Sequence, residues 1–255
     1  MERYSAIPHL VRRTSFGVRI VHLALNFARH WLLFINLSIG VWVGLPWLAP
    51  LFIHLGWEKA ANIIYLIYSF QCHQLPQRSF FLFGSQSMHS LSQIQATGVD
   101  ITSPLLLRQF IGNTEMGWKV AWSDRMVTMY TSILLFGMVY SLFRKLLKPL
   151  SFLGFALLLL PMAVDGGTHA ISDLAGIGQG FRDSNAWLAM MTGNLLPAAF
   201  YAGDALGSFN SWMRLITGFL FGLAVVWLMH PYMSEFFADY ANNLNAKLDR
   251  AGSQK

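Results

Sequence analysis

The segment 31–55, WLLFINLSIGVWVGLPWLAPLFIHL, is 25 residues long and contains no Asp, Glu, Lys or Arg. An α-helix needs about 20 mostly apolar residues to cross a bilayer, so this segment predicts a membrane-spanning helix. Pro46 and Pro50 are expected to kink it. Across the whole chain of 255 residues, 55% are hydrophobic and 12% are charged, about half the charged fraction of soluble domains. The sequence therefore predicts an all-α integral membrane protein.

Further apolar segments complete the expected bundle. They lie near 60–76, 126–143, 150–164 and 212–229. The segment near 60–76 either crosses the membrane or re-enters it from one side, so we expect four or five transmembrane helices. Gly193, Asn194 and Pro197 interrupt another apolar segment, 186–203, which we expect to be re-entrant or interfacial.

The two ends of the chain have a different, amphipathic pattern. In residues 1–30, polar side chains recur at spacings of three, four or seven: Arg12, Ser15, Arg19, His22, Asn26 and Arg29. This pattern predicts a basic amphipathic helix in the headgroup plane, or a helix packed on a partner protein. Residues 233–255 predict a second amphipathic helix, expected in the cytoplasm. Residues 79–117 are too polar to span a membrane and predict an ordered extramembrane loop.

The positions of the basic residues, which give the chain its formal charge of +6, indicate which side of the membrane each segment faces. The basic residues flank apolar segments, which is typical of a cytoplasmic membrane surface and not of a nucleic-acid-binding face. Residues 144–148, RKLLK, join two expected spans and should therefore be cytoplasmic. The expected partner is the lipid bilayer of the inner (plasma) membrane, with no nucleic acid.

This orientation places three polar blocks together at the non-cytoplasmic face. The candidate site residues are Cys72, His73, Gln74, Arg78 and Ser79 in the first block, Ser123 and Asp124 in the second, and Asp165, Thr168, His169 and Asp173 in the third. Two interpretations are open. The blocks either form a hydrogen-bonded network that ties helix ends together, or they form a reactive or metal-binding site.

The metal hypothesis depends on residue type and spacing. Cys72, His73, Asp165 and His169 have side chains that bind zinc, and ligands four residues apart share one face of a helix. Against this, neighbouring residues such as Cys72 and His73 point in different directions. A single cysteine also excludes a disulfide framework and a site built of thiolates alone.

Four segments carry a family resemblance. CHQLPQRSFFLFG (72–84), GWKVAWSDRMVTMY (117–130), LPMAVDGGTH (160–169) and RLITGFLFGLAVVWLMHPY (214–232) resemble the signature blocks of a family of bacterial and archaeal multi-pass membrane proteins. That family is catalogued as a domain of unknown function. Its members usually carry cysteine where Ser123 stands and glutamine where His169 stands. The resemblance implies a helical membrane fold and a membrane location, but no reaction.

Three further features concern packing and charge. Gly218 and Gly222 form a GxxxG pattern, which indicates close helix packing within one chain or between copies. Arg214 is expected to pair with Asp204 or to reach lipid headgroups. Arg78 is expected to cap helix carbonyls or to bind a lipid phosphate.

Several classes of function remain open from the sequence. The first is a membrane protein with a polar site of unassigned activity, and the second is an accessory or scaffold subunit of a larger membrane complex. The third is a zinc-dependent membrane hydrolase, in which zinc would activate water, or a lipid transporter. The expected spans carry no charged residue at mid-membrane, which argues against an ion-coupled pathway.

Overall fold

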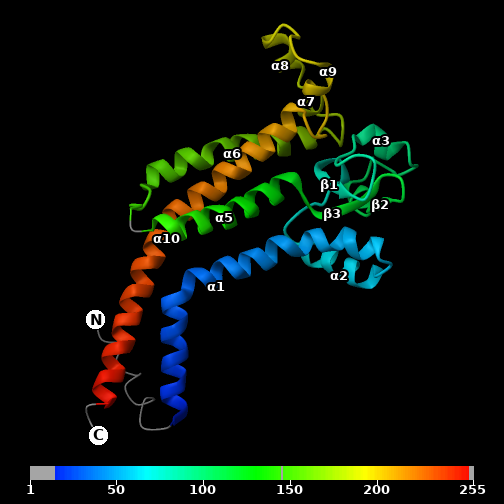
Figure 1. Ribbon diagram of the computed structural model, residues 1–255. Helices are drawn as coiled ribbons and strands as arrows, with labels where there is room; N and C mark the ends of the chain where they lie inside the picture. The colour runs from blue at the N-terminus through cyan, green and yellow to red at the C-terminus, as the bar shows by residue number, and fades with distance from the viewer. Residues whose placement is uncertain (1–14, 145, 253–255) are drawn as a thin grey trace.

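The computed structural model describes residues 15–144 and 146–252, and four of its helices form a membrane bundle (Figure 1). These helices are α1 (Ser15–His54), α5 (Asp124–Phe143), α6 (Phe152–Asp173) and α10 (Phe209–Gly252). Each is long and apolar enough to cross a membrane. The predicted all-α membrane fold is therefore confirmed, and α10 is its centre because it packs against α1, α5 and α6.

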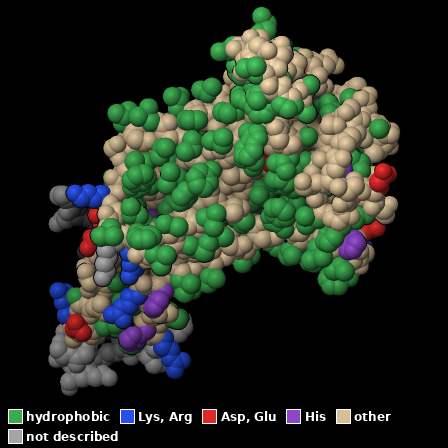
Figure 2. All heavy atoms as spheres, turned by 45° about the horizontal axis from the view of Figure 1, so that its top comes forward, with side chains coloured by type: hydrophobic (Ala, Val, Ile, Leu, Met, Phe, Trp, Pro, Cys, Tyr) green, Lys and Arg blue, Asp and Glu red, His purple; other side chains and the backbone are tan. Residues whose placement is uncertain are grey.

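The outer surface of the bundle is apolar. Leu37 and Val41 of α1 are exposed, as are Leu153, Leu157 and Leu160 of α6. Figure 2 shows hydrophobic side chains spread over this surface, with Lys and Arg gathered at one end. Exposing these apolar side chains to water would be unfavourable, whereas lipid hydrocarbon would cover them. The surface therefore suits the interior of a bilayer.

The amphipathic ends pack on each other at one end of the bundle. The backbone of α1 leaves helical geometry at His30 (φ −116°, ψ 19°). Before this bend, Val21 and Leu25 pack against Ala241 and Leu244 of α10. We call this helix pair, residues 17–30 and 233–250, the stalk, and Figure 1 shows it leaving the bundle at a steep angle. Residues 1–14 and 253–255 of the two expected amphipathic ends lie outside the described residues.

The opposite end of the bundle, which we call the sheet end, holds the longest connection. Its elements are α2 (Glu58–Ser69), the 3-10 helix η1 (Pro76–Arg78), β1 (Ser79–Leu82), α3 (Leu91–Gln95), α4 (Pro104–Leu107), β2 (Gly112–Asn113) and β3 (Gly117–Ser123). The strands form an antiparallel sheet in the order β1-β3-β2, with Ser79 opposite Ser123. The sequence predicted order in 79–117 but no strands. The rings of Trp42, Tyr68 and Trp122, in tilted and edge-to-face contacts, pack the sheet against α1 and α2.

The segment near 60–76 is not among the candidate membrane spans of the described residues. Helix α2 has 12 residues, about 18 Å at 1.5 Å per residue, which is too short to cross a bilayer. The chain therefore stays at the sheet end between α1 and α5. Of the two alternatives the structure gives four candidate spans, with both ends of the described chain on the stalk side (Figure 1).

Helix α6 is longer than expected, and the interrupted segment 186–203 is partly helical. Helix α6 continues nine residues beyond 164, through Gly166 and Gly167, so that its last turns carry Asp165 to Asp173 to the sheet end. Residues 186–203 form two short helices, α8 (Ala186–Met191) and α9 (Ala198–Tyr201), which follow α7 (Phe181–Ser184). Helix α10 passes through Pro231 without ending.

Gly218 and Gly222 lie where α10 packs on α5. A Cβ at Gly218 would lie 3.1 Å from the carbonyl oxygen of Arg125, and one at Gly222 would meet the Ser132 hydroxyl and lie 2.8 Å from the backbone nitrogen of Ile133. The Ser132 hydroxyl also donates to the Gly218 carbonyl at 3.2 Å. The GxxxG face therefore packs within the chain.

We expect Gly222→Ala to lower the free energy of unfolding by about 1–3 kcal/mol, because the added methyl group overlaps α5. Gly44→Ala is the matched control, since no described atom lies within 4 Å of a Cβ there. Both changes gain similar helix propensity, so their difference isolates packing. The measurement is unfolding in mixed detergent micelles, and equal stabilities of the two variants would contradict this packing.

Candidate functional site

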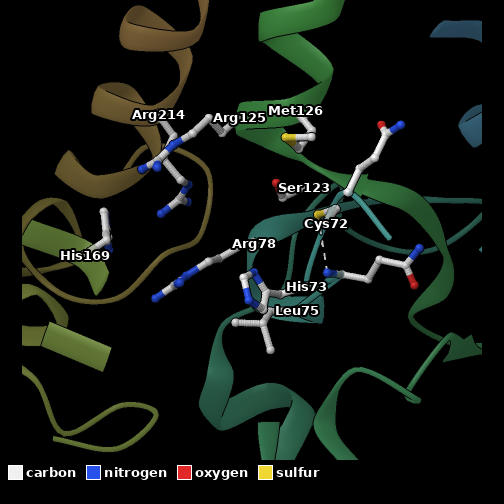
Figure 3. Close-up of a pocket in the computed structure, with 11 residues that line it drawn as sticks. Cys72, His73, Leu75, Arg78, Ser123, Arg125, Met126, His169 and Arg214 are labelled. Carbon is white, nitrogen blue, oxygen red and sulfur yellow. Dashed lines mark hydrogen bonds between the residues drawn. The ribbon is translucent and has the colours of Figure 1, made fainter. Parts of the chain in front are cut away.

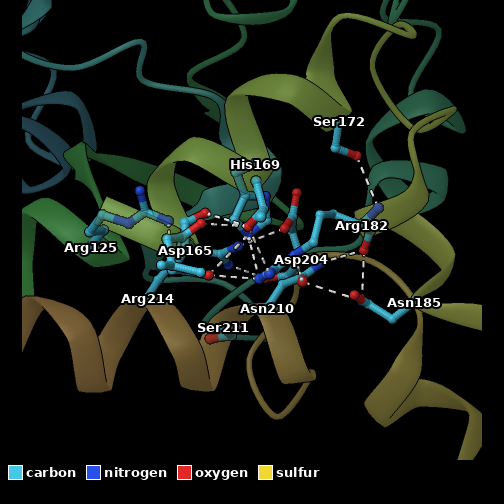
Figure 4. Close-up of polar contacts among 12 residues, drawn as sticks. Arg125, Asp165, His169, Ser172, Arg182, Asn185, Asp204, Asn210, Ser211 and Arg214 are labelled. Carbon is cyan, nitrogen blue, oxygen red and sulfur yellow. Dashed lines mark hydrogen bonds and ion pairs between the residues drawn. The ribbon is translucent and has the colours of Figure 1, made fainter. Parts of the chain in front are cut away.

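Charged side chains from distant parts of the chain meet at the sheet end (Figure 4). Four arginines and four aspartates form one region of ion pairs: Arg78, Arg125, Arg182, Arg214, Asp124, Asp165, Asp173 and Asp204. They come from η1, the ends of α5, α6 and α10, α7, and the loop before α10. With all eight ionised, the four positive and four negative charges cancel. We call this set the ion-pair network.

One branch of the network runs across the sheet end. Arg78 binds both carboxylate oxygens of Asp173, each at 2.8 Å, and its Nε donates to Asp204 at 2.7 Å. Asp204 also accepts from Arg214 Nη1 at 2.6 Å, and Arg214 Nε donates to Asp124 at 2.7 Å. This branch therefore ties η1, α6, α10 and α5 together.

The second branch centres on Asp165. Its two oxygens accept from Arg125 at 2.6 Å and from Arg182 at 2.7 Å. Arg182 also donates to the Thr168 hydroxyl and to the Asn210 side chain, both at 3.1 Å. Asp165 is thereby fully engaged, and α5, α6 and α7 are fixed relative to one another.

The network is largely shielded from solvent. The side chains of Asp124, Asp204 and Arg214 are at most 3% exposed. Burial alone would raise the pKa of Asp204, but the guanidinium groups of Arg78 and Arg214 outweigh it and the pKa is lowered. Removing one member of such a pair leaves a buried charge without a partner, which typically costs about 3–5 kcal/mol.

A pocket of about 160 Å³ lies beside the network (Figure 3). It is lined by Gln71, Cys72, His73, Gln74, Leu75, Arg78, Ser123, Arg125, Met126, His169 and Arg214. Three of these are arginines and two are histidines, and no Asp or Glu of the described residues contributes to the wall. The pocket wall is therefore basic by residue type, while each of its three arginines already pairs with a carboxylate of the network.

Two of the residues that line the pocket each carry a buried nitrogen atom that has no partner among the described residues. His169 is 4% exposed, and its Nε2 lies 3.2 Å from Nη2 of Arg182. Because a guanidinium group only donates, Nε2 must accept and the ring proton must sit on Nδ1. His169 Nδ1 and Arg125 Nε are both buried and unpaired in the described structure. Such buried donors are costly unless a ligand or water satisfies them.

Ser123 adds a hydroxyl group to the pocket wall. It is the N-cap residue of α5, but its side chain makes no capping hydrogen bond. The N-terminus of the 20-residue α5 therefore faces the pocket region with its positive dipole end.

A buried lysine, Lys119, donates a hydrogen bond to the backbone of residues 71–75, which we call the pocket loop. The Lys119 side chain is fully buried, and its Nζ donates to the carbonyl oxygens of Gln74 and Arg108, both at 2.8 Å. Gln74 is in the left-handed region (φ 53°), and its backbone N–H donates to the Cys72 sulfur at 3.3 Å. Burial lowers the pKa of Lys119 from 10.5 to about 7, outweighing the opposite influence of Cys72.

The structure divides the predicted site residues into two groups. Cys72, His73, Gln74, Arg78, Ser123 and His169 line the pocket, whereas Asp124, Asp165, Thr168 and Asp173 belong to the network or contact it. Ser79 takes part in neither, since its hydroxyl donates to the Leu75 carbonyl at 2.9 Å. The three blocks therefore lie at the same end of the bundle.

The geometry does not support the proposed zinc ligands Cys72, His73, Asp165 and His169. No group of three or more His, Cys, Asp or Glu side chains within 15–144 and 146–252 could hold a metal ion. Both oxygens of Asp165 accept from arginines, and His169 Nε2 faces Arg182. Asp165 and the Nε2 atom of His169 are therefore engaged by arginines.

The Ser123–Asp124–Arg125 block was predicted as part of the site, whereas several other residues were not: Lys119, Arg182, Asn185, Asn210 and Ser211. The expected pairing of Arg214 with Asp204 is confirmed at 2.6 Å. Arg78 binds the carboxylates of Asp173 and Asp204 and not the expected helix carbonyls. No local signal marked Lys119 and Arg182, because they lie in β3 and α7 and only tertiary contacts bring them to the site.

We expect Asp204→Asn to lower the free energy of unfolding by about 3 kcal/mol or more, because it leaves Arg78 and Arg214 short of one buried negative charge. Asp100→Asn is the control, since Asp100 is exposed and bonds only Thr102 among the described side chains. Unfolding in mixed micelles measures both. A cost for Asp204→Asn no greater than that of the control would contradict the structural role of the network.

The buried Lys119 predicts a pH-dependent stability. Between pH 7 and pH 10.5 the unfolded chain carries a proton on this amine that the folded chain lacks, so the free energy of unfolding should rise with pH there. The expected slope is about 1.4 kcal/mol per pH unit. Unfolding of the wild type and of Lys119→Met at pH 6.5, 8.0 and 9.5 measures it. The slope should disappear in Lys119→Met and persist in Lys59→Met, which changes an exposed lysine; equal slopes in all three proteins would refute the assignment.

Comparisons with known proteins agree with the membrane fold and name no activity. Residues 114–203 match the family model described as "Predicted membrane protein (DUF2085)", a stretch that includes Ser123, Asp165 and His169 but not the Cys72 block. An uncharacterised protein of Methanocaldococcus jannaschii is 28% identical over 195 residues, which cover 74% of this chain and 83% of that protein. No solved structure matches the chain. The chain is thus similar to multi-pass membrane proteins of unknown function.

Proposed function

We propose that this protein binds a small oxyanion, of the phosphate or carboxylate class, in the pocket at the sheet end. The observation that carries the proposal is the pocket wall itself, with three arginines, two histidines and no described acid. Within it, His169 Nδ1 and Arg125 Nε are buried donors without a partner. An anion that accepts from both would remove their desolvation cost.

The arrangement of the network favours anion binding by preorganisation. The arginines are already fixed by Asp124, Asp165, Asp173 and Asp204, so their side chains lose little freedom when a ligand arrives. The N-terminus of α5 adds a favourable dipole at Ser123. Oxyanions also match the geometry of guanidinium donors better than chloride does, because they present several oxygens in fixed directions.

The distribution of charge supports an orientation with the sheet end outside the cytoplasm. Arg144 and Lys148 lie in the connection between α5 and α6, at the stalk end. The stalk itself carries Arg19, Arg29 and Lys247. Because basic residues concentrate on the cytoplasmic side of membrane proteins, the pocket would receive its ligand from the non-cytoplasmic side.

Calorimetric titration of the purified protein with inorganic phosphate, at fixed ionic strength against chloride, tests the proposal. We expect saturable binding that weakens at least about tenfold in Arg125→Gln and in His169→Leu, because the first removes a charge and the second removes a buried donor. Arg29→Gln, which removes a cation at the stalk, should bind like the wild type. A parallel titration with a short-chain phosphatidic acid distinguishes a lipid headgroup from the free anion.

The variants differ in their risk to folding. Arg125→Gln leaves Asp165 with one arginine, so Ser123→Ala, which touches no ion pair, serves as the milder change and should weaken binding several-fold. Thermal unfolding shows whether each variant is folded. The proposal fails if phosphate gives the same heats as chloride, or if the folded pocket variants bind as tightly as Arg29→Gln.

A further inference from the structure

We propose that residues 186–203, which we call the lobe, insert into the bilayer leaflet at the sheet end. The lobe comprises α8 and α9 with the turn between them. Its tip is apolar and open, with Met190 81%, Met191 79% and Leu195 86% exposed. No Asp, Glu, Lys or Arg occurs in these 18 residues. Large side chains of this kind rarely gather on a surface that faces water.

The position of the lobe fits a lipid partner. Figure 1 shows α8 and α9 projecting sideways from the sheet end of the bundle, past the end of α6. The neighbouring part of α6 exposes Ile171 and Leu174, at 63% and 86%, as part of its lipid-facing surface. The lobe thus extends an apolar surface that already belongs to the membrane domain, at the level where the spans end.

The lobe satisfies much of its own polar chemistry, as entry into an apolar phase requires. The Thr192 hydroxyl donates to the Leu188 carbonyl at 2.9 Å, and Asn194 N–H donates to the Ala189 carbonyl at 2.9 Å. The Tyr201 hydroxyl accepts from Leu196 N–H at 3.1 Å. These bonds pair groups of the irregular turn that would otherwise have to face lipid or water.

The base of the lobe is fixed to the ion-pair network. Asn185, at φ 43°, donates to the carbonyl oxygens of Arg182 and Tyr201, both at 2.7 Å. Asn210 donates to the carbonyl oxygens of Arg182 and Gly203, at 2.7 and 2.9 Å. The lobe is therefore held in one direction, with its apolar tip away from the network.

Depth-dependent fluorescence quenching tests the insertion. In a Cys72→Ser background, Leu195→Cys and Met191→Cys are each labelled with an environment-sensitive fluorophore and reconstituted into phosphatidylcholine and phosphatidylglycerol vesicles. Gln95→Cys, at an exposed position in the polar connection of the sheet end, is the matched control. We expect lipid-borne quenchers to act several-fold more strongly on the lobe labels than on the control, and aqueous iodide to show the reverse order.

The outcomes separate the bilayer from other partners. Equal access of iodide to Leu195→Cys and Gln95→Cys in vesicles would overturn the proposal. Protection of the lobe in native membranes but not in pure lipid vesicles would also overturn it, since a protein would then be the partner. Neither result depends on whether the pocket binds an anion.

Discussion

The shared carboxylate of Asp204 is the interaction on which the sheet end depends. It lies between Arg78 and Arg214, with side chains of Asp204 and Arg214 only 3% exposed, and these two arginines reach onward to Asp173 and Asp124. Charges this close to a bilayer must be neutralised by partners in the protein, because neither lipid nor water is there to do so. That requirement fixes where α5, α6, α10 and η1 end relative to one another.

The pocket is a consequence of this constraint. Carboxylates occupy one side of the arginines, and Lys119 holds the pocket loop through Gln74. What remains is a wall with cationic side chains and two buried donors, His169 Nδ1 and Arg125 Nε, that the described chain itself does not satisfy. Buried polar groups usually have partners, so these two unsatisfied donors are the observation on which the proposed anion site depends.

The sequence predicted those parts of the fold that depend on local composition. Hydropathy located α1, α5, α6 and α10, since each must present an apolar surface to lipid. It failed at α2, whose 12 residues are apolar enough to look like a span but pack at the sheet end. The strands were not predicted because they are two to seven residues long and are stabilised by pairing with distant segments.

The site was predicted in part, because the positions of some of its residues also follow from local composition. Position near span ends indicated that the Cys72, Ser123 and Asp165 blocks would lie at one end. Of the two arginine partners of Asp165, Arg182 could not be found in this way, because it reaches Asp165 only through the fold of α7. The four-residue spacing on α6 suggested metal ligands, whereas in the tertiary structure Asp165 forms ion pairs with Arg125 and Arg182.

The most direct test of the central claim uses the only cysteine of the chain, Cys72, which lines the pocket. Its alkylation by iodoacetamide can be followed by mass with no competing thiol, with and without inorganic phosphate at constant ionic strength. An occupied pocket predicts alkylation that slows several-fold and saturably as phosphate is added. A rate that stays the same at all phosphate concentrations, in a protein shown to be folded, would contradict an oxyanion site at this end of the bundle.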